Sequence, residues 1–291
     1  MTAQNTASGP TIESELARVL KDIGIPPRPV ILDRIAEEMR KEDPSLIYLG
    51  QLISADVSLS ASLIKMANSP YFGLHTRARS VNDAMLMLGL KVTSQAIAGL
   101  SLRRAFAATP PMERFWNSSA QMAVLSGWLA HILEKPRLRT DETYTYGLFR
   151  DCGIPVLLRR FPDYERTLAR ANDELELPFT EVELKDIPAD HATVGCLLAQ
   201  NWWLPEEICL AIRHHHDLQT VDLLQSPLPA ATRHMIAVGH TAEYLLQLNT
   251  GLSHTCEWTK HGAACLRLLD ITQAELPALC EEADEVLKTA A

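Results

Sequence analysis

The sequence lacks the features of nucleic-acid-binding, membrane-spanning and secreted proteins. Its 291 residues carry a formal net charge of −9 and no stretch dense in lysine and arginine, so we expect no nucleic-acid partner, because the phosphates would be repelled. No apolar run approaches the roughly 20 residues that span a bilayer. The N-terminus has neither the basic region nor the apolar core of a secretion signal. We therefore expect a cytoplasmic protein without a membrane partner.

Paired cysteines and strand-like patterns are also absent. None of the six cysteines belongs to a C-x-x-C pair, which favours small buried apolar residues in a reducing compartment over a disulfide framework. Apolar residues recur with helical spacing, and no stretch alternates with a period of two. Hydrophobic residues make up 47% of the chain and charged residues 22%, as in ordinary globular proteins. The sequence predicts an all-α fold.

Prolines, glycines and apolar spacing divide the chain into segments. Residues 1–10 are small and polar and are predicted to be a disordered tail. Residues 11–217 are predicted to form one helical domain, with 24–106 and 112–217 as two closely packed helical lobes. Residues 218–291 are predicted to form a C-terminal helical extension that packs on this domain and is a candidate partner surface.

Several polar residues have the spacing of helix caps. Asp43, which precedes a proline, predicts a helix start. Thr180 with Glu183, and Thr272 with Glu275, have the three-residue separation of a capping box. These pairs are therefore interpreted as helix starts.

The passage 56–90 is predicted to be a tightly packed array of short helices. Asp56 caps the first helix, Ser80 and Asp83 resemble a capping box with Asp in place of Glu, and Gly89 suits a left-handed C-terminal turn. The passage holds no nucleophile–base pair and no phosphate-binding loop, so its polar residues are interpreted as structural. The residues predicted to be buried there are Leu63 and Leu88.

A histidine-rich passage lies on two predicted helices. Asp190 can cap the first of them, which begins at His191. On the second, His215 continues an apolar stripe and should face the interior, while His214 and His216 flank it. Two helices that deliver histidines towards one interior can build a metal site. The alternative is a set of packed, hydrogen-bonded histidines without metal.

An ordered set of positions runs through the first third of the chain: Asp56, Leu59, Leu63, Ala67, Asn68, Ser69, Phe72, Gly73, Ser80, Val81, Ala84, Leu88 and Gly89. This set closely resembles the HDOD family, the "HD-related output domain". The resemblance extends from about Gly24 to His216, and its motifs are specific as an ordered set. Val57 departs from the family pattern, which has proline after the aspartate, but a helix can still start there. The resemblance implies a multi-helical HD-like bundle, with Asp56, Asn68, Ser69, Gly73 and Gly89 as structural signature residues.

The resemblance also implies a function. HDOD proteins are non-catalytic, all-helical modules of bacterial regulatory pathways that act through protein–protein contacts. We therefore expect a free-standing signal-transduction or output module whose partners are signalling proteins of unknown identity.

The related HD-superfamily phosphohydrolases hold divalent metal with an early histidine, a His-Asp dyad and a later aspartate. By resemblance, Asn117 stands at the position of the early histidine, and Arg150 with Asp151 stands at the dyad. Arginine has no lone pair to offer a metal ion. The resemblance therefore implies a degenerate site with no catalytic residue, no metal and no cofactor, in which Asp151 pairs with Arg150 or with a histidine.

Two alternatives stay open. The first is a divalent-metal-dependent phosphohydrolase acting on a nucleotide or a cyclic dinucleotide, which would rest on Asp151, His191, His214 and His215. The second is a sensor of a small phosphate-containing ligand that contacts Arg150, since a guanidinium group matches phosphate geometry.

Overall fold

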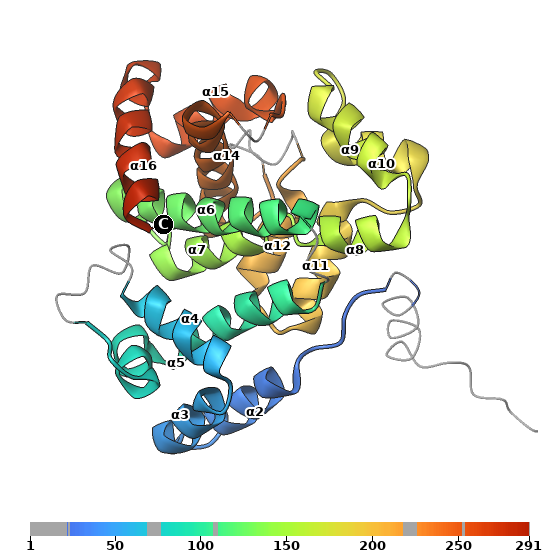
Figure 1. The fold of residues 1–291 in the computed structure, drawn as a ribbon. Helices are drawn as coiled ribbons and strands as arrows, with labels where there is room; N and C mark the ends of the chain where they lie inside the picture. Colours follow the sequence, from blue (N-terminus) through green and yellow to red (C-terminus); the bar gives the residue numbers. More distant parts are fainter. Residues whose placement is uncertain are drawn as a thin grey trace, which may run out of the picture.

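The computed structural model describes residues 22, 24–68, 77–106, 110–217, 226–251 and 254–290. Every regular element in these residues is a helix, which confirms the all-α prediction (Figure 1). The predicted tail at 1–10 and the signature residues Ser69 and Gly73 lie outside the described residues.

In its described residues, 24–68 and 77–106, the N-terminal lobe has four helices around an apolar core. Leu63 is fully buried and Leu88 is 9% exposed, which confirms both predicted core positions. The last helix kinks at Gly89, whose φ of 75° and ψ of 163° are accessible to glycine but differ from the predicted left-handed turn. The four helices are α2 (Val30–Met39), α3 (Leu46–Ser54), α4 (Val57–Ala67) and α5 (Val81–Arg104).

Side-chain caps start three of these helices. Asp56 accepts hydrogen bonds from two backbone N–H groups of the first turn of α4, and Ser80 and Asp83 form a complete capping box on α5, as predicted. The predicted cap at Asp43 is wrong, because α3 begins two residues later than the sequence signal suggested. Ser45 caps it instead, and its hydroxyl accepts a hydrogen bond within the first turn.

The remaining helices form the other part of the molecule, above the N-terminal lobe in Figure 1. Helices α6, α7, α12 and α14 pack against one another, and α5 packs on α7, so that one hydrophobic core runs from Ile25 to Ala283. The helices are α6 (Pro110–Leu133), α7 (Thr140–Phe149), α8 (Gly153–Arg160), α9 (Tyr164–Asp173), α10 (Phe179–Asp186), α11 (His191–Asn201), α12 (Glu206–His214), α14 (Ala230–Thr250), α15 (Glu257–Leu269), the 3-10 helix η2 (Gln273–Glu275) and α16 (Leu276–Ala290).

Helix α5 is long and apolar enough to cross a membrane, which differs from the expectation that no such segment exists. Its apolar window has a mean hydropathy of 1.4, and 56% of that window is buried inside the protein. Length and composition alone therefore do not distinguish it from a core helix. Helices α3 and α4 together are also long and apolar enough, but the two are bent by 117° at the break between them.

The break between α7 and α8 places the first residue of the candidate site. Gly153 opens α8 against the first turn of α11, where a Cβ atom would lie 2.0 Å from the carbonyl oxygen of His191 and 2.8 Å from the backbone nitrogen of Gly195. Only a residue without a side chain permits this approach. It brings Asp151, two residues earlier, beside His191.

Candidate metal centre

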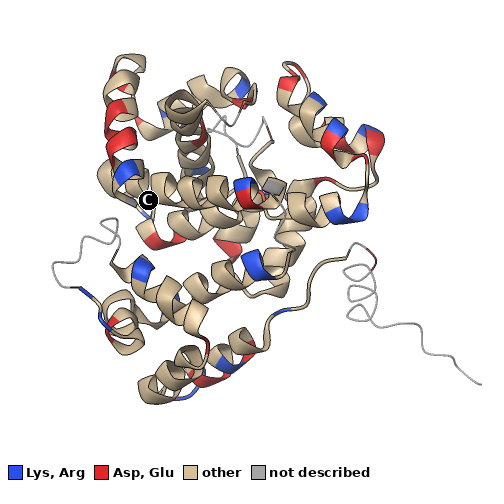
Figure 2. Cartoon of the chain, viewed as in Figure 1, with Lys and Arg blue, Asp and Glu red and all other residues tan. Residues whose placement is uncertain are grey.

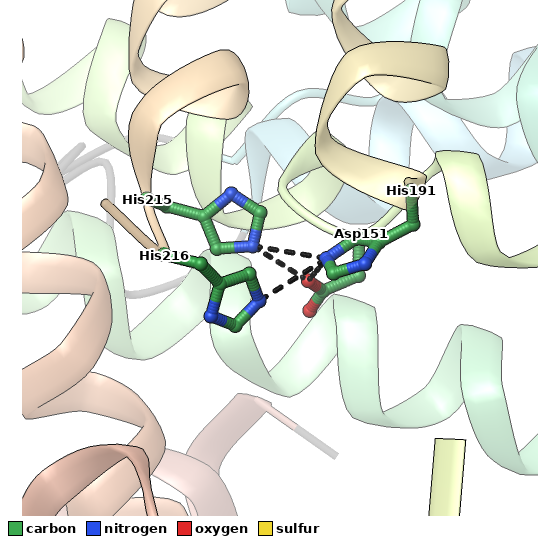
Figure 3. Close-up of side chains that lie close together, drawn as sticks. All are labelled: Asp151, His191, His215 and His216. Atoms are coloured by element: carbon green, nitrogen blue, oxygen red, sulfur yellow. Dashed lines mark hydrogen bonds and ion pairs between the residues drawn. The ribbon is translucent and has the colours of Figure 1, made fainter. Parts of the chain in front are cut away.

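Four side chains from three separate parts of the chain meet inside the molecule. Asp151 lies in the break after α7, His191 is the first residue of α11, and His215 and His216 directly follow α12 (Figure 3). His191 Nε2 lies 3.2 Å from the Nε2 atoms of both other histidines. The Oδ1 atom of Asp151 lies 3.3 Å from His215 Nε2 and 3.6 Å from His191 Nε2. We call these four residues the His–Asp cluster.

The opposite nitrogen of each imidazole has a fixed hydrogen-bond partner. His191 Nδ1 lies 2.9 Å from both oxygens of Glu183, and His215 Nδ1 lies 2.7 Å from the carbonyl oxygen of Ile212. His216 Nδ1 lies 2.5 Å from Glu257 Oε2. Because all three partners can only accept, each Nδ1 carries a proton, and the lone pair of a neutral imidazole sits on Nε2.

Three Nε2 lone pairs and a carboxylate oxygen therefore converge on one point. Four acceptors at these separations repel one another unless a positive charge lies among them. A proton can supply that charge: burial tends to lower the pKa of His191, but Glu183, together with Asp151 and Asp190, outweighs burial and raises it. A metal cation can also supply it and would displace the proton.

The dimensions of the His–Asp cluster fit a tetrahedral metal site. Zinc binds histidine nitrogen and carboxylate oxygen at about 2.0–2.2 Å, which gives a tetrahedron with edges of about 3.3–3.6 Å. Four of the six separations, 3.2, 3.2, 3.3 and 3.6 Å, are close to those edges, and all four ligand atoms lie within 4.8 Å of one another. Hydrogen bonds from the metal-binding histidines to carboxylates and carbonyls are the usual supporting arrangement. The donor set would suit zinc and other divalent first-row metals.

Burial keeps two of the imidazoles neutral. His191 and His215 are fully buried and His216 is 4% exposed. Loss of hydration lowers the pKa of His215 and, together with His215 beside it, lowers the pKa of His216 well below its ordinary value. Asp151 is the solvent-facing member, with 27% of its side chain exposed. Burial tends to raise the pKa of Asp151, but Arg150 and His215 outweigh burial and hold it below its usual range.

Arg150 lies beside the His–Asp cluster but is mainly bound elsewhere. Its side chain is 2% exposed, and Nη2 donates a hydrogen bond of 2.9 Å to Glu243 on α14. Its Nη1 lies 3.9 Å from Asp151, within ion-pair range but too far for a hydrogen bond. Of the two partners predicted for Asp151, Arg150 is present only as a long ion pair, whereas the histidine is present as His215, whose Nε2 lies 3.3 Å from Asp151 Oδ1. Nothing in the sequence singled out Glu243, which lies in the middle of a long predicted helix.

Two residues named from the sequence lie outside the His–Asp cluster. His214 is half-buried, with Nδ1 3.7 Å from Asp217, and its place in the predicted metal set is taken by His216. The helical pattern failed there because α12 ends at His214, so the following residues no longer keep helical spacing. Asn117 is exposed on α6, where Trp116 and Ser119 occupy the buried face, and its correspondence to the early histidine of HD enzymes stays a prediction.

Sequence reasoning also misread Glu183. α10 begins at Phe179 without a side-chain cap, so the predicted capping box with Thr180 is wrong. Glu183 is instead fully buried, accepts a hydrogen bond from the hydroxyl of Tyr164, and binds His191 through both its ring and its backbone N–H. The second predicted box, Thr272 with Glu275, is confirmed at η2.

A sequence model of the HDOD domain family matches residues 25–218. The chain belongs to the HDOD family. A curated relative from Treponema pallidum, described as an uncharacterized protein, is 28% identical over 195 residues, which are 67% of this chain and 38% of the relative. The chain thus spans well under half the length of that relative.

Solved structures share the fold of this HDOD protein. An HDOD domain protein of unknown function from Geobacter sulfurreducens has a TM-score of 0.59 at 22% identity, covering 94% of this chain and 97% of its own. A protein from Shewanella amazonensis described as a candidate metal-dependent phosphohydrolase has a TM-score of 0.66 at 18% identity, with 96% and 98% covered. A candidate signal transduction protein from Marinobacter aquaeolei has a TM-score of 0.64 at 20% identity, with 94% and 59% covered.

Proposed function

We propose that this HDOD protein is a non-catalytic signalling module that acts through protein contacts and holds one divalent metal ion in its His–Asp cluster. The observation that carries the non-catalytic part is Arg150 at the dyad position. In HD-type enzymes that position supplies an imidazole to the metal centre, whereas here it holds a buried cation bound to Glu243. A permanent positive charge next to Asp151 opposes a second metal ion.

The metal ion itself would have its coordination positions filled by protein. Three imidazoles and one carboxylate complete a tetrahedral set, which is the pattern of structural sites. Hydrolytic sites keep an open position for the water that becomes the nucleophile. The metal in this proposal stabilises the arrangement of α11, α12 and the α7–α8 break, and it does not activate water.

Exposed apolar side chains support the protein-contact part of the proposal. Most of the exposed large apolar residues in the described part of the chain belong to the N-terminal lobe, far along the sequence from the His–Asp cluster. By contrast, acidic residues gather along α16, and both signs of charge are mixed elsewhere (Figure 2). The apolar residues are Val30, Met39, Leu46, Ile47, Tyr48, Val57 and Leu86.

A metal-dependent phosphohydrolase is the second candidate, and the convergence of the Nε2 atoms favours it. Asp151 is partly exposed, so a phosphoester could approach the metal from that side. In that case Asp151 or a displaced ligand would have to open a coordination position for water.

Binding of a phosphate-containing ligand without turnover also has a supporting observation. Nε and Nη1 of Arg150 find no hydrogen-bond acceptor among the described residues. Buried donors of this kind are usually satisfied, and a phosphate oxygen or a water molecule would be an acceptor for them.

One set of assays separates these candidates. The purified protein is loaded with one equivalent of Zn²⁺, Mn²⁺ or Fe²⁺ and tested on nucleotides, cyclic dinucleotides and a chromogenic phosphodiester. We expect no turnover above the metal-only blank, and an Asp151→Asn variant should be indistinguishable from the wild type. Turnover that Asp151→Asn abolishes, in a folded and metal-loaded variant, would establish the phosphohydrolase instead.

The protein-contact part needs a separate test. A photo-crosslinking residue at position 57, where Val57 is 82% exposed, should yield a protein adduct in the native host. The matched control is the same residue at position 248, since Leu248 on α14 is 52% exposed outside the N-terminal lobe. Equal labelling at both positions, or at neither, would argue against a contact surface on the N-terminal lobe.

A further inference from the structure

The segment after residue 218 supplies one of the partners of the His–Asp cluster. Glu257, the first residue of α15, is 1% exposed and lies 2.5 Å from His216 Nδ1 through its Oε2 atom. The family match ends at residue 218, so this carboxylate comes from outside it. The HDOD portion alone therefore lacks the acceptor that faces His216.

The carboxylate of Glu257 is itself held in place by its neighbours. Lys260 donates a hydrogen bond of 2.7 Å to Oε1 and another of 2.8 Å to the carbonyl oxygen of Leu177. His261 Nε2 lies 3.4 Å from Oε2. Lys260 is almost fully buried, with 3% of its side chain exposed. A buried carboxylate fixed by a buried cation keeps its position and its negative charge. It can accept a hydrogen bond from a ring N–H group but has no proton to donate to a bare ring nitrogen.

The orientation of the His216 ring agrees with this arrangement. The ring stacks on Phe179 with centroids 4.6 Å apart and an interplanar angle of 17°. Stacking fixes the plane of the ring but does not choose between its two tautomers. The hydrogen bond to Glu257 makes that choice, because it requires the proton on Nδ1.

We propose that Glu257 is a positioning residue: it holds the proton on Nδ1 of His216, so that the Nε2 lone pair faces the other members of the His–Asp cluster. The inference rests on the proposed metal site for its effect on metal affinity, but the effect on the tautomer does not depend on metal. Glu183 has the same role for His191, whose Nδ1 it faces, and it lies within the family match. The C-terminal segment thus completes a site that the HDOD portion begins.

The test uses the full chain with nitrogen-labelled histidine. The main variant is the double substitution Glu257→Leu with Lys260→Met, which removes the carboxylate without leaving a buried ammonium group unpaired. In the metal-free protein, NMR correlations of the ring nitrogens should show His216 protonated at Nδ1 in the wild type and a mixture of tautomers in the double variant. Zinc affinity, measured by chelator competition, should fall about 10–100-fold.

Two single variants serve as controls. Lys260→Met alone keeps the acceptor, so the His216 tautomer should stay as in the wild type. Glu257→Gln keeps an acceptor oxygen without charge and should retain the Nδ1 proton with a smaller loss of zinc affinity, which also keeps the proposal testable if the double variant does not fold.

Retention of the Nδ1 proton and of full zinc affinity in the folded double variant would overturn the proposal. The same holds for Glu257→Gln if it alone folds and matches the wild type in zinc affinity. Absence of zinc binding in the wild type would instead refute the proposed metal site, and the tautomer of His216 would still decide the role of Glu257.

Discussion

Polar side chains in the N-terminal lobe mostly serve the ends of helices, whereas in the rest of the molecule they meet in the interior. Ser45, Asp56 and Ser80 cap helices at the surface of the N-terminal lobe. In the other part, histidines, carboxylates and an arginine lie buried side by side. Burying such groups costs free energy unless each finds a partner, so a protein keeps them together only where their arrangement serves a purpose.

The family signature and the candidate chemistry thus occupy different regions. The signature residues that the structure describes are Asp56, Asn68 and Gly89, and each has a structural role. Asn68, for example, exchanges two hydrogen bonds with the backbone of Ala78. The His–Asp cluster lies more than 60 residues further along the chain, and one of its hydrogen-bond partners, Glu257, lies beyond the family match. Family membership therefore identifies the scaffold, and the site has to be argued from its own atoms.

The largest loss of stability is expected when the buried polar network loses Glu183, which accepts hydrogen bonds from two residues. Glu183→Ala leaves the hydroxyl of Tyr164 and the ring of His191 without their acceptor, so the free energy of unfolding should fall by about 3–5 kcal/mol. Denaturant titration measures this fall. Glu181→Ala, an exposed site on the same helix, is the matched control and should change it by less than about 0.5 kcal/mol. Similar small effects for both would mean that the buried network does not stabilise this region.

In the N-terminal lobe the corresponding loss is apolar. Leu63 is fully buried, so Leu63→Ala should lower the free energy of unfolding by about 2–5 kcal/mol, and Leu88→Ala should cost less within that range because Leu88 is slightly exposed. Zinc should stabilise Leu63→Ala as much as it stabilises the wild type, because the two sites share no contacts. A zinc effect that disappears in Leu63→Ala would show that the two regions are coupled.

A smaller loss of stability is expected when Arg150 loses its partner, and two variants distinguish which carboxylate that partner is. Since Arg150 donates its hydrogen bond to Glu243, Glu243→Ala should cost about 1–3 kcal/mol in the metal-free protein. Asp151→Ala should lower the free energy of unfolding by less, because Asp151 lies 3.9 Å from Arg150 and its side chain is partly exposed. Paired thermal and denaturant unfolding of the two variants decides the order. A larger loss for Asp151→Ala would make Asp151 the main partner of Arg150, which is one of the two pairings that the sequence suggested.

The smallest loss of stability is expected from the removal of a helix cap. Ser80→Ala removes the hydroxyl that accepts the N–H of Asp83, at 3.1 Å, from the first turn of α5. The free energy of unfolding should fall by about 1 kcal/mol. Ser80→Asp keeps an acceptor at the same place and should recover most of the loss. Failure of Ser80→Asp to recover stability would assign the effect to something other than capping.

Much of the fold followed from the sequence, because helical spacing and caps are local signals. Leu63 as a core residue and Ser80 with Asp83 as a capping box were readable in this way. Only some residues of the candidate site could be predicted from the sequence. Asp151, His191 and His215 were named, but Glu243 and Glu257 come from distant helices whose packing leaves no mark in a single sequence. Glu183 was misassigned because a capping box and a buried hydrogen-bond acceptor have the same local spacing.

If His191, His215, His216 and Asp151 bind one metal ion, the coordination shell of the metal-loaded protein must contain all four. X-ray absorption on protein saturated with Zn²⁺ and freed of excess metal reports the number and type of ligands. We expect one zinc ion per chain with three imidazole nitrogens and one oxygen at about 2.0–2.2 Å, and one imidazole fewer in His216→Ala. Zinc that is absent after removal of the excess, or a shell unchanged in His216→Ala, would contradict this expectation.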